Sequence, residues 1–139
     1  MTTSARDAEE SRIVAITAGE PAGIGPELCA MLAARHARAP FAARLVILGD
    51  RALLVQRAAR IGVDAAFPEF DACRIADLPP LSVWNVPCTV PVTPGQPDPA
   101  NAAHVLSILA IRCDACATGD FASLVTAPGQ KSVRLDAGI

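Results

Sequence analysis

The fold is decided by residues 13–28, which read IVAITAGEPAGIGPEL. A nearly continuous, β-branched apolar run ends at Gly19 and is typical of a strand with both faces covered, as in a parallel sheet. A short turn follows, and Pro26 and Glu27 open a helical pattern. Proline needs no N–H acceptor at the first helical position, and the helix dipole stabilises a carboxylate there. A strand, a glycine-rich turn and a helix in this order form the part of an α/β domain where small anionic ligands usually dock.

The rest of the chain alternates between apolar runs and helical patterns. The predicted strands are residues 12–18, 44–49, 63–67, 81–86 and 121–127, and the predicted helices are residues 26–39, 51–61, 100–118 and 132–136. Strands separated by helices are typical of parallel pairing. The sequence therefore predicts an α/β fold, with a largely parallel sheet and flanking helices. On the first helix, the spacing of Leu28, Met31 and Leu32 predicts a stripe that faces the core.

The chain has 139 residues, about the length of one domain. Residues 1–11 are polar and are predicted to be disordered, whereas residues 12–139 are predicted to form a single α/β domain. Prolines recur through residues 87–99 and exclude a long helix or a central strand there. This segment is predicted to be irregular, as an arm, a lobe boundary or a long loop.

Composition excludes several classes of function. The net charge is −2, so no basic surface predicts a nucleic-acid partner. No apolar run approaches the roughly 18 residues of a membrane span, and the polar start lacks the features of a secretory signal, so a cytoplasmic protein is expected. The hydrophobic fraction is nevertheless 52%. Two features are expected to contribute to this high fraction: the heavy alanine content, and an apolar face that would pack against a partner structure.

Cysteines and histidines give no clear site. The chain has 5 cysteines at irregular spacing, unlike a secreted disulfide framework. Cys113 and Cys116 form a C-x-x-C without a second pair, which favours two small buried helix residues over metal or redox chemistry. His36 and His104 are predicted to be partly exposed helix residues without a ligand partner.

The glycine-rich turn contains Gly19, Gly23 and Gly25, but it is neither the G-x-G-x-x-G dinucleotide fingerprint nor a P-loop. Two interpretations are equally favoured. The glycines let a ligand approach the backbone and the free N–H groups of the helix. Alternatively, they only permit a tight turn with positive φ.

A second candidate region follows the last predicted strand. Thr126 ends that strand and Lys131 lies just beyond it, where open α/β sheets bind ligands. The Lys131 ammonium could meet a phosphate or carboxylate, although a solvated surface lysine is the favoured alternative. No nucleophile elbow, paired-carboxylate site or metal set is visible, so no catalytic or metal-binding residue is predicted.

Two motifs together resemble the signatures of a known family. Residues 16–27, ITAGEPAGIGPE, closely resemble the amino-terminal signature of 4-hydroxythreonine-4-phosphate dehydrogenases. Residues 124–128 (LVTAP), Lys131 and residues 136–139 (DAGI) are similar to the second signature of that family. The order and separation of the motifs also suit the family, and the resemblance covers essentially the whole chain.

The resemblance implies an oxidoreductase of vitamin B6 (pyridoxine) biosynthesis. Such an enzyme uses NAD to oxidise the secondary alcohol of 4-phosphooxy-L-threonine, and the resulting β-keto acid loses CO2. A homodimer, a divalent metal (Zn, Mg or Co) and a fold like the isocitrate and isopropylmalate dehydrogenases are also implied. The metal would polarise the hydroxyl and stabilise the enolate, while NAD receives the hydride. The residues expected near substrate or cofactor are Gly19, Glu20, Gly23, Gly25, Thr126 and Lys131.

The sequence departs from the family pattern in ways that bear on activity. The family's substrate-contacting Gly-His-Thr-Glu segment and its metal-binding histidines would lie beyond Ile139. Gly129 and Gln130 stand where the family usually has a hydrophobic and then a polar residue, and Ala102 replaces a family glycine. The chain is therefore interpreted as a truncated, amino-terminal portion of such an enzyme, expected to bind no cofactor and to be inactive alone.

Two alternatives remain open. The enzyme could act on a related four-carbon sugar-acid phosphate, such as threonate or erythronate phosphate. From another class, the chain could be a non-catalytic module that binds a nucleotide, or a partner through an exposed apolar face.

Overall fold

The computed structural model describes residues 12–119 and 121–127. Within them, four strands alternate with three α-helices and two short 3-10 segments. In chain order the elements are β1 (Ile13–Thr17), α2 (Gly25–Arg38), β2 (Arg44–Gly49), α3 (Arg51–Arg60), η1 (Ala72–Asp77), β3 (Leu81–Asn85), η2 (Pro99–Asn101), α4 (Ala102–Thr118) and β4 (Ser123–Thr126).

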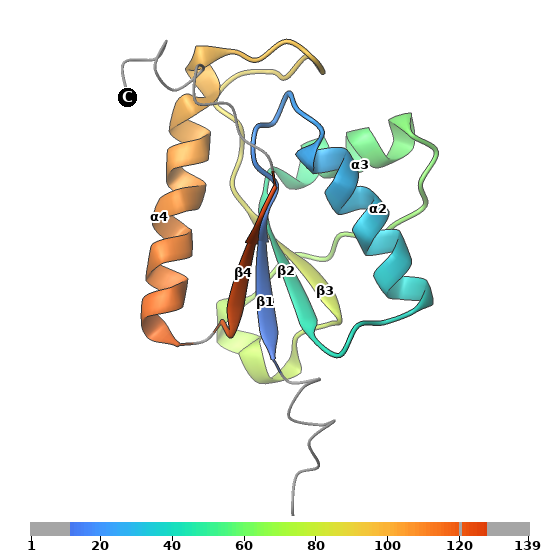
Figure 1. Ribbon diagram of the computed structural model, residues 1–139, viewed down its shortest axis with the longest axis vertical. Coiled ribbons are helices and arrows are strands. Elements are labelled where there is room, and N and C mark those ends of the chain that lie inside the picture. The colour runs from blue at the N-terminus through green and yellow to red at the C-terminus, as the bar shows by residue number, and fades with distance from the viewer. Residues whose placement is uncertain (1–11, 120, 128–139) are drawn as a thin grey trace, which may run out of the picture.

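The strands form one sheet in the order β3-β2-β1-β4, and every pair of neighbours is parallel. Helices α2 and α3 lie on one side of this sheet and α4 on the other, as Figure 1 shows. A parallel sheet needs both faces covered, because the crossover connections place helices over them. The predicted α/β fold with a parallel sheet and flanking helices is confirmed.

The apolar core has two layers because both faces of the sheet are buried. Ile16 and Ile47 pack on the side of α2 and α3, in one cluster with Ala30 and Leu54. Their sequence neighbours point the other way, so that Val46 packs on the side of α4. Successive side chains of a strand alternate between faces. A strand that is covered on both sides therefore has a continuous apolar sequence, as β1 and β2 do.

The predicted core-facing stripe of α2 is wrong for Leu28 and Met31, which are 45% and 54% exposed. Leu32 is half-buried and packs against the edge of the core. The buried face of α2 is made instead by the smaller residues Gly25, Pro26, Cys29, Ala30 and Ala33, together with His36. Small side chains let the helix backbone approach the sheet closely, and this displaces the larger apolar residues to the opposite face.

Ile24, which directly precedes α2, and Leu28 and Met31 on that helix are exposed apolar residues spaced by four and three positions, and they form an exposed apolar stripe. We expect this stripe to bind anilinonaphthalene sulfonate and to raise its fluorescence, because contiguous exposed apolar surface offers the dye a site. The double variant Leu28→Gln, Met31→Gln should lose most of the signal. Val55→Gln changes an exposed apolar side chain of α3, outside this stripe, and serves as the control. An unchanged signal in the double variant would contradict the proposal that this stripe binds the dye.

The predicted strand at residues 63–67 is also wrong, since no strand forms there. The chain pairs with β3 slightly later, where Glu69 makes an isolated parallel bridge with Val83. The Phe70 N–H donates to the Val83 carbonyl at 2.8 Å, and the Val83 N–H donates to the Pro68 carbonyl at 2.7 Å. Phe67 is buried, so its apolar character reflects packing against the core and not strand formation.

The proline-rich segment is irregular, as the sequence predicts. Residues 87–98 contain no helix or strand, apart from an isolated bridge between Thr93 and Gln96. The predicted helix at residues 100–118 begins with the 3-10 segment η2 before α4. The predicted disorder of residues 1–11 and the predicted helix at residues 132–136 lie outside the described residues.

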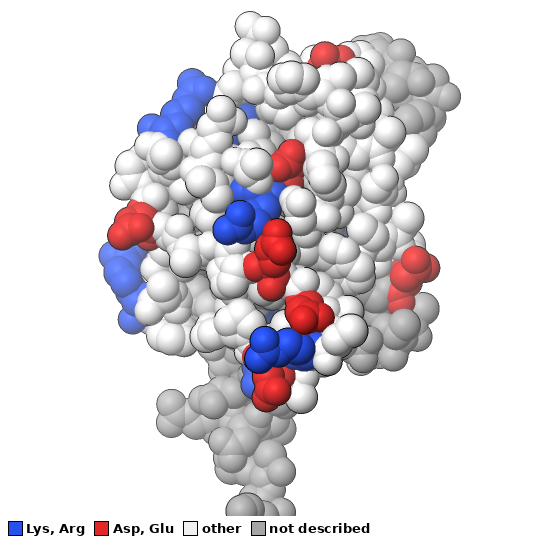
Figure 2. All heavy atoms as spheres, turned by 180° about the vertical axis from the view of Figure 1, so that it is seen from behind, with Lys and Arg blue, Asp and Glu red and all other residues white. Residues whose placement is uncertain are grey.

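In the described part of the chain, none of the helices combines the length and the apolar character needed to cross a membrane. The face seen in Figure 2 carries scattered charges of both signs and no broad basic patch.

Candidate functional site

The carboxyl ends of the four parallel strands meet at one edge of the sheet. The glycine loop, residues 19–25, follows β1 at this edge and leads into α2, at the top of Figure 1. Backbone bonds continue the ladder past the strand ends. The Ala18 N–H donates to the Leu48 carbonyl at 3.0 Å, and the Ala127 N–H donates to the Thr17 carbonyl at 3.0 Å. Open α/β sheets bind ligands at this edge, so the glycine loop lies where a ligand is expected.

Each glycine of the loop occupies a position where a larger residue would be strained or crowded, for a different reason in each case. Gly19 has a φ of 73°, in the left-handed region that glycine adopts without strain. A Cβ on Gly25 would overlap the backbone carbonyl of Ala18, because α2 starts directly against the end of β1. A Cβ on Gly23 would lie 3.3 Å from the Glu20 carbonyl oxygen. The need for a tight turn is thus met at Gly19 and Gly25, and ligand contact by these glycines stays a prediction.

Glu20 is folded back onto the loop. Its side chain is buried, and Oε1 accepts from the Ala22 N–H at 3.2 Å. Its backbone carbonyl accepts from the Gly23 N–H at 3.0 Å. Glu20 therefore shapes the turn from within, as carboxylates commonly do when they accept from nearby backbone N–H groups.

Arg57, a residue that sequence reasoning missed, holds the loop from α3. It is 1% exposed, and its guanidinium donates to the Pro21 carbonyl at 2.7 Å and to the Gly23 carbonyl at 3.0 Å. It also meets Glu27 Oε1 at 3.5 Å. A signal was present in the sequence, since Arg57 shares the apolar side of α3 with Leu53, Leu54 and Ala58. A charge on a buried helix face needs a partner, which indicates a specific contact.

A second polar group lies beside the loop, around Asp50. Its side chain caps α3 by accepting from the Leu53 N–H at 3.2 Å, and it accepts from the Cys88 N–H at 2.9 Å. Burial by itself would raise the pKa of Asp50, but these bonds outweigh it and hold the pKa below its ordinary value. Burial, followed by the charge of Asp50, raises the pKa of the Cys88 thiol to about 12. Cys88 is therefore a protonated thiol near neutral pH and not a nucleophile.

The prediction that His36 and His104 are partly exposed is wrong. They are 1% and 3% exposed. His104 Nδ1 lies 3.2 Å from the Pro87 carbonyl and ties α4 to the proline-rich segment. His36 Nε2 lies 3.0 Å from the Pro80 carbonyl, and its Nδ1 accepts from the Phe41 N–H at 3.1 Å. Each imidazole thus joins a helix to a distant loop, which helical periodicity cannot reveal.

Acid should destabilise the fold through His104. Burial lowers the pKa of His104 below 6.5, although the Pro87 carbonyl and the charges of Asp50 and Glu20 oppose this. The unfolded chain therefore binds more protons than the folded chain once the pH falls below 6.5. The stability that neutral His104 contributes is complete above that value and is lost as the pH falls through the lower folded pKa.

We expect the free energy of unfolding in urea to fall between about pH 7.5 and about pH 5.5. In His104→Asn the side-chain amide can still donate to Pro87 but does not titrate, so this fall should be smaller. An equal fall in both proteins would contradict the role of His104.

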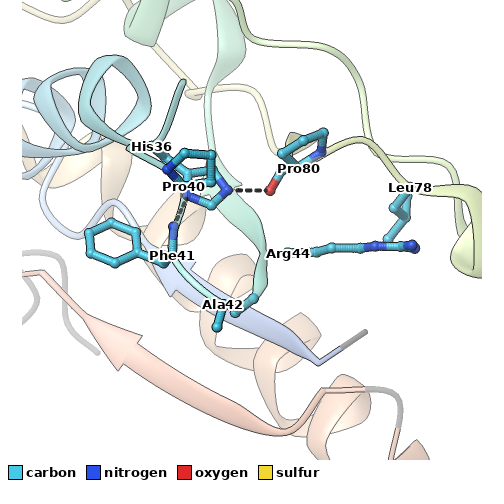
Figure 3. Close-up of a pocket in the computed structure, with 8 residues that line it drawn as sticks. His36, Pro40, Phe41, Ala42, Arg44, Leu78 and Pro80 are labelled. Carbon is cyan, nitrogen blue, oxygen red and sulfur yellow. Dashed lines mark hydrogen bonds between the residues drawn. The ribbon is translucent and has the colours of Figure 1, made fainter. Parts of the chain in front are cut away.

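Hollows lie at both the carboxyl edge and the amino edge of the sheet. One of about 480 Å³ lies at the carboxyl edge, between Asp50, Cys88 and residues 89–92. A larger one of about 600 Å³ lies at the amino edge of β2, where Figure 3 shows His36 and Phe41 on one side and Arg44 and Leu78 on the other. Both ring nitrogens of His36 are already bonded within the protein. Because parallel sheets bind ligands at the carboxyl edge, size alone does not make the larger hollow the site.

The structure describes only some of the other residues that the sequence singled out. Thr126 ends β4 and is exposed at the same edge as the glycine loop, whereas Lys131 lies outside the described residues. Cys113 is exposed, which corrects the prediction that it is buried; the side chain of Cys116 is not described. Among the described residues, no three His, Cys, Asp or Glu side chains are grouped closely enough to hold a metal ion.

Comparisons with known proteins agree with this geometry. The family model described as "Pyridoxal phosphate biosynthetic protein PdxA" matches residues 41–139. The chain is 43% identical over 127 residues to the 4-hydroxythreonine-4-phosphate dehydrogenase of Chromobacterium violaceum, covering 91% of this chain. It is 46% identical over 127 residues to the enzyme of that name from Aromatoleum aromaticum, again covering 91% of this chain. It spans 38% and 37% of the lengths of these two relatives.

The fold is also that of a solved relative. The crystal structure of a 4-hydroxythreonine-4-phosphate dehydrogenase from Burkholderia phymatum matches with a TM-score of 0.78 at 18% identity, covering 91% of this chain and 39% of that one. The likeness confirms the predicted architecture as part of an isocitrate/isopropylmalate dehydrogenase-like fold. The sequence match fixes the family: the chain belongs to that of the pyridoxal phosphate biosynthetic protein PdxA.

Proposed function

We propose that this chain supplies one wall of the active-site cleft of an NAD-dependent dehydrogenase in pyridoxal 5'-phosphate biosynthesis. The whole protein would oxidise and decarboxylate 4-phosphooxy-L-threonine, as a cytoplasmic homodimer with a divalent metal. Membership of the family and the names of its curated relatives support this activity. The observation that supports the proposal most strongly is the position of the glycine loop at the carboxyl edge of the sheet, where α2 starts.

The loop would act by accommodating and orienting a negatively charged group. The first N–H groups of a helix have no partner inside the helix, and the dipole favours an anion beside them. Gly25 lets α2 start directly against β1, and exposed Thr126 ends the neighbouring strand β4. Lys131 follows that strand in the sequence and is proposed to add a positive charge on the same side.

The described residues do not fit a metal site, because no group of three potential ligands occurs among them. No step through a metal is therefore assigned to these residues. NAD, when bound to the whole protein, would accept the hydride from the substrate carbon. The contribution of the described residues is to bind and orient the substrate or the cofactor.

A chimera tests this proposal. The chain would replace the matching segment of the Chromobacterium violaceum relative, to which it is 43% identical. We expect the chimera to form NADH from 4-phosphooxy-L-threonine, with kcat/KM within roughly a hundredfold of the parent, since a displacement of about 1 Å can cost that much. Threonate and erythronate phosphates are the competing substrates. A chimera that folds but reduces NAD with neither class of substrate would contradict the proposal, and faster turnover of a sugar-acid phosphate would favour the alternative substrate.

An assay of the isolated chain complements the assay of the chimera. We expect no NADH when it is mixed with NAD, substrate and Zn²⁺, Mg²⁺ or Co²⁺, because its described residues offer no metal site. Absorbance at the NADH band measures this directly. Turnover by the isolated chain would show that it contains a complete catalytic centre.

A further inference from the structure

Arg57 makes an unusual set of contacts for a buried cation. It lies on α3, but both terminal nitrogens of its guanidinium point at the glycine loop, where they donate to the Pro21 and Gly23 carbonyls at 2.7 and 3.0 Å. The Nε atom is buried and has no acceptor among the described residues. The side chain is thus committed to the loop and not to the rest of the core.

These two bonds fix the orientation of peptide planes in the loop. A peptide unit is planar, and its C=O and N–H point in opposite directions. By drawing the Gly23 carbonyl toward α3, Arg57 turns the Ile24 N–H away from α3. By drawing the Pro21 carbonyl, it sets the Ala22 N–H, which donates to Glu20 Oε1 at 3.2 Å. One side chain thereby sets the geometry on both sides of Gly23.

The charges around Arg57 keep it in place. Glu27, in the first turn of α2, lies 3.5 Å from Nη1 and partly neutralises the cation. A buried cation without such a partner would be strongly unfavourable. The planar fork of arginine can donate to two carbonyls and a carboxylate at once, which the single ammonium of lysine cannot do with the same geometry.

We propose that Arg57 is a positioning residue that sets the glycine loop for binding of the phosphorylated substrate or the cofactor, a role that rests on the proposed function. It touches no ligand itself. It acts through the carbonyls of Pro21 and Gly23, so that the peptide planes around Gly23, the Ile24 N–H among them, and the start of α2 are arranged before the ligand arrives. Such preorganisation lowers the ordering cost of binding.

Hydrogen exchange on the full chain tests the loop directly. In Arg57→Met, which keeps an unbranched apolar stem but removes the guanidinium, we expect exchange of the Ala22 and Gly23 amides to rise by about tenfold or more, while the amides of β2 stay protected. Arg57→Lys should give a smaller rise. Arg60→Met removes an exposed arginine from the same helix and is the matched control. If Arg57→Met does not fold, amide exchange in Arg57→Lys is compared with that in Arg60→Met instead.

The same variants in the chimera test the link to binding. We expect Arg57→Met to raise KM for the phosphorylated substrate or for NAD by about tenfold, with a smaller change in kcat, because ligand-independent order is lost. Loop exchange and KM equal to those of Arg60→Met would overturn the proposal. Faster exchange spread evenly over β2 and the loop would also overturn it, since that is a purely structural effect. If the unmodified chimera makes no NADH, the proposed function fails, while the exchange result still decides the role of Arg57 in the loop.

Discussion

Gly25→Ala is expected to destabilise the folded chain by about 3 kcal/mol or more, because a new methyl group meets atoms that cannot move aside. Its Cβ would overlap the backbone carbonyl of Ala18 and lie 3.1 Å from the Cβ of Ala127. Ala18 and Ala127 directly follow β1 and β4, and their N–H groups donate to the Leu48 and Thr17 carbonyls of the sheet. Relief would require α2 to move away from the carboxyl edge, and the glycine loop with it. Urea unfolding followed by circular dichroism measures the loss.

Gly62→Ala is the matched control. Gly62 has a φ of 70° at the end of α3, and nothing lies within 4 Å of a Cβ placed there. Alanine at this position should cost only about 1 kcal/mol, the usual strain of a non-glycine residue with positive φ. If Gly25→Ala costs no more than Gly62→Ala, the close contact between α2 and β1 is not as described.

Ala30→Leu is expected to destabilise the chain by about 2 to 3 kcal/mol, whereas Leu28→Ala should change the free energy of unfolding by less than about 0.5 kcal/mol. Ala30 is completely buried between α2 and the sheet, so a larger side chain must push the helix outward. Leu28 lies on the exposed stripe of α2, and alanine there also has the higher helix propensity. Thermal or urea unfolding of both variants gives the comparison.

The pair is informative because helical periodicity alone predicts the reverse order. A large loss in Leu28→Ala with little loss in Ala30→Leu would mean that the large residues of α2 face the core. The alternative explanation, a general sensitivity of α2 to substitution, is checked by Arg38→Ala, since Arg38 is an exposed residue in the last turn of that helix.

The sheet could be predicted from the sequence because its signal is local. Residues 44–49 are apolar at almost every position, and the structure places β2 at those residues, with both neighbours parallel. Gly49 and Asp50 end the strand, and Asp50 then caps α3. The orientation of α2 could not be obtained in the same way. Its apolar residues occupy more than one face, and only the closeness of the sheet selects the small ones for burial.

The site could be predicted only in outline. The glycine loop was identifiable because Gly19, Gly23 and Gly25 lie between a strand and a helix. The contacts that hold the loop were not, since Arg57 is 34 residues away from Gly23 in the sequence. His104 and Pro87 are likewise brought together by folding. Long-range polar contacts of this kind depend on the packing of α3 and α4, which no local pattern encodes.

The decisive measurement is the yield of CO2 and NADH when the chimera with the Chromobacterium violaceum relative is given 4-phosphooxy-L-threonine and NAD. If the chain forms a wall of an oxidising and decarboxylating cleft, the two products should appear in about equal amounts, since each substrate oxidised loses one carboxyl group. A correctly folded chimera that produces neither would contradict this assignment.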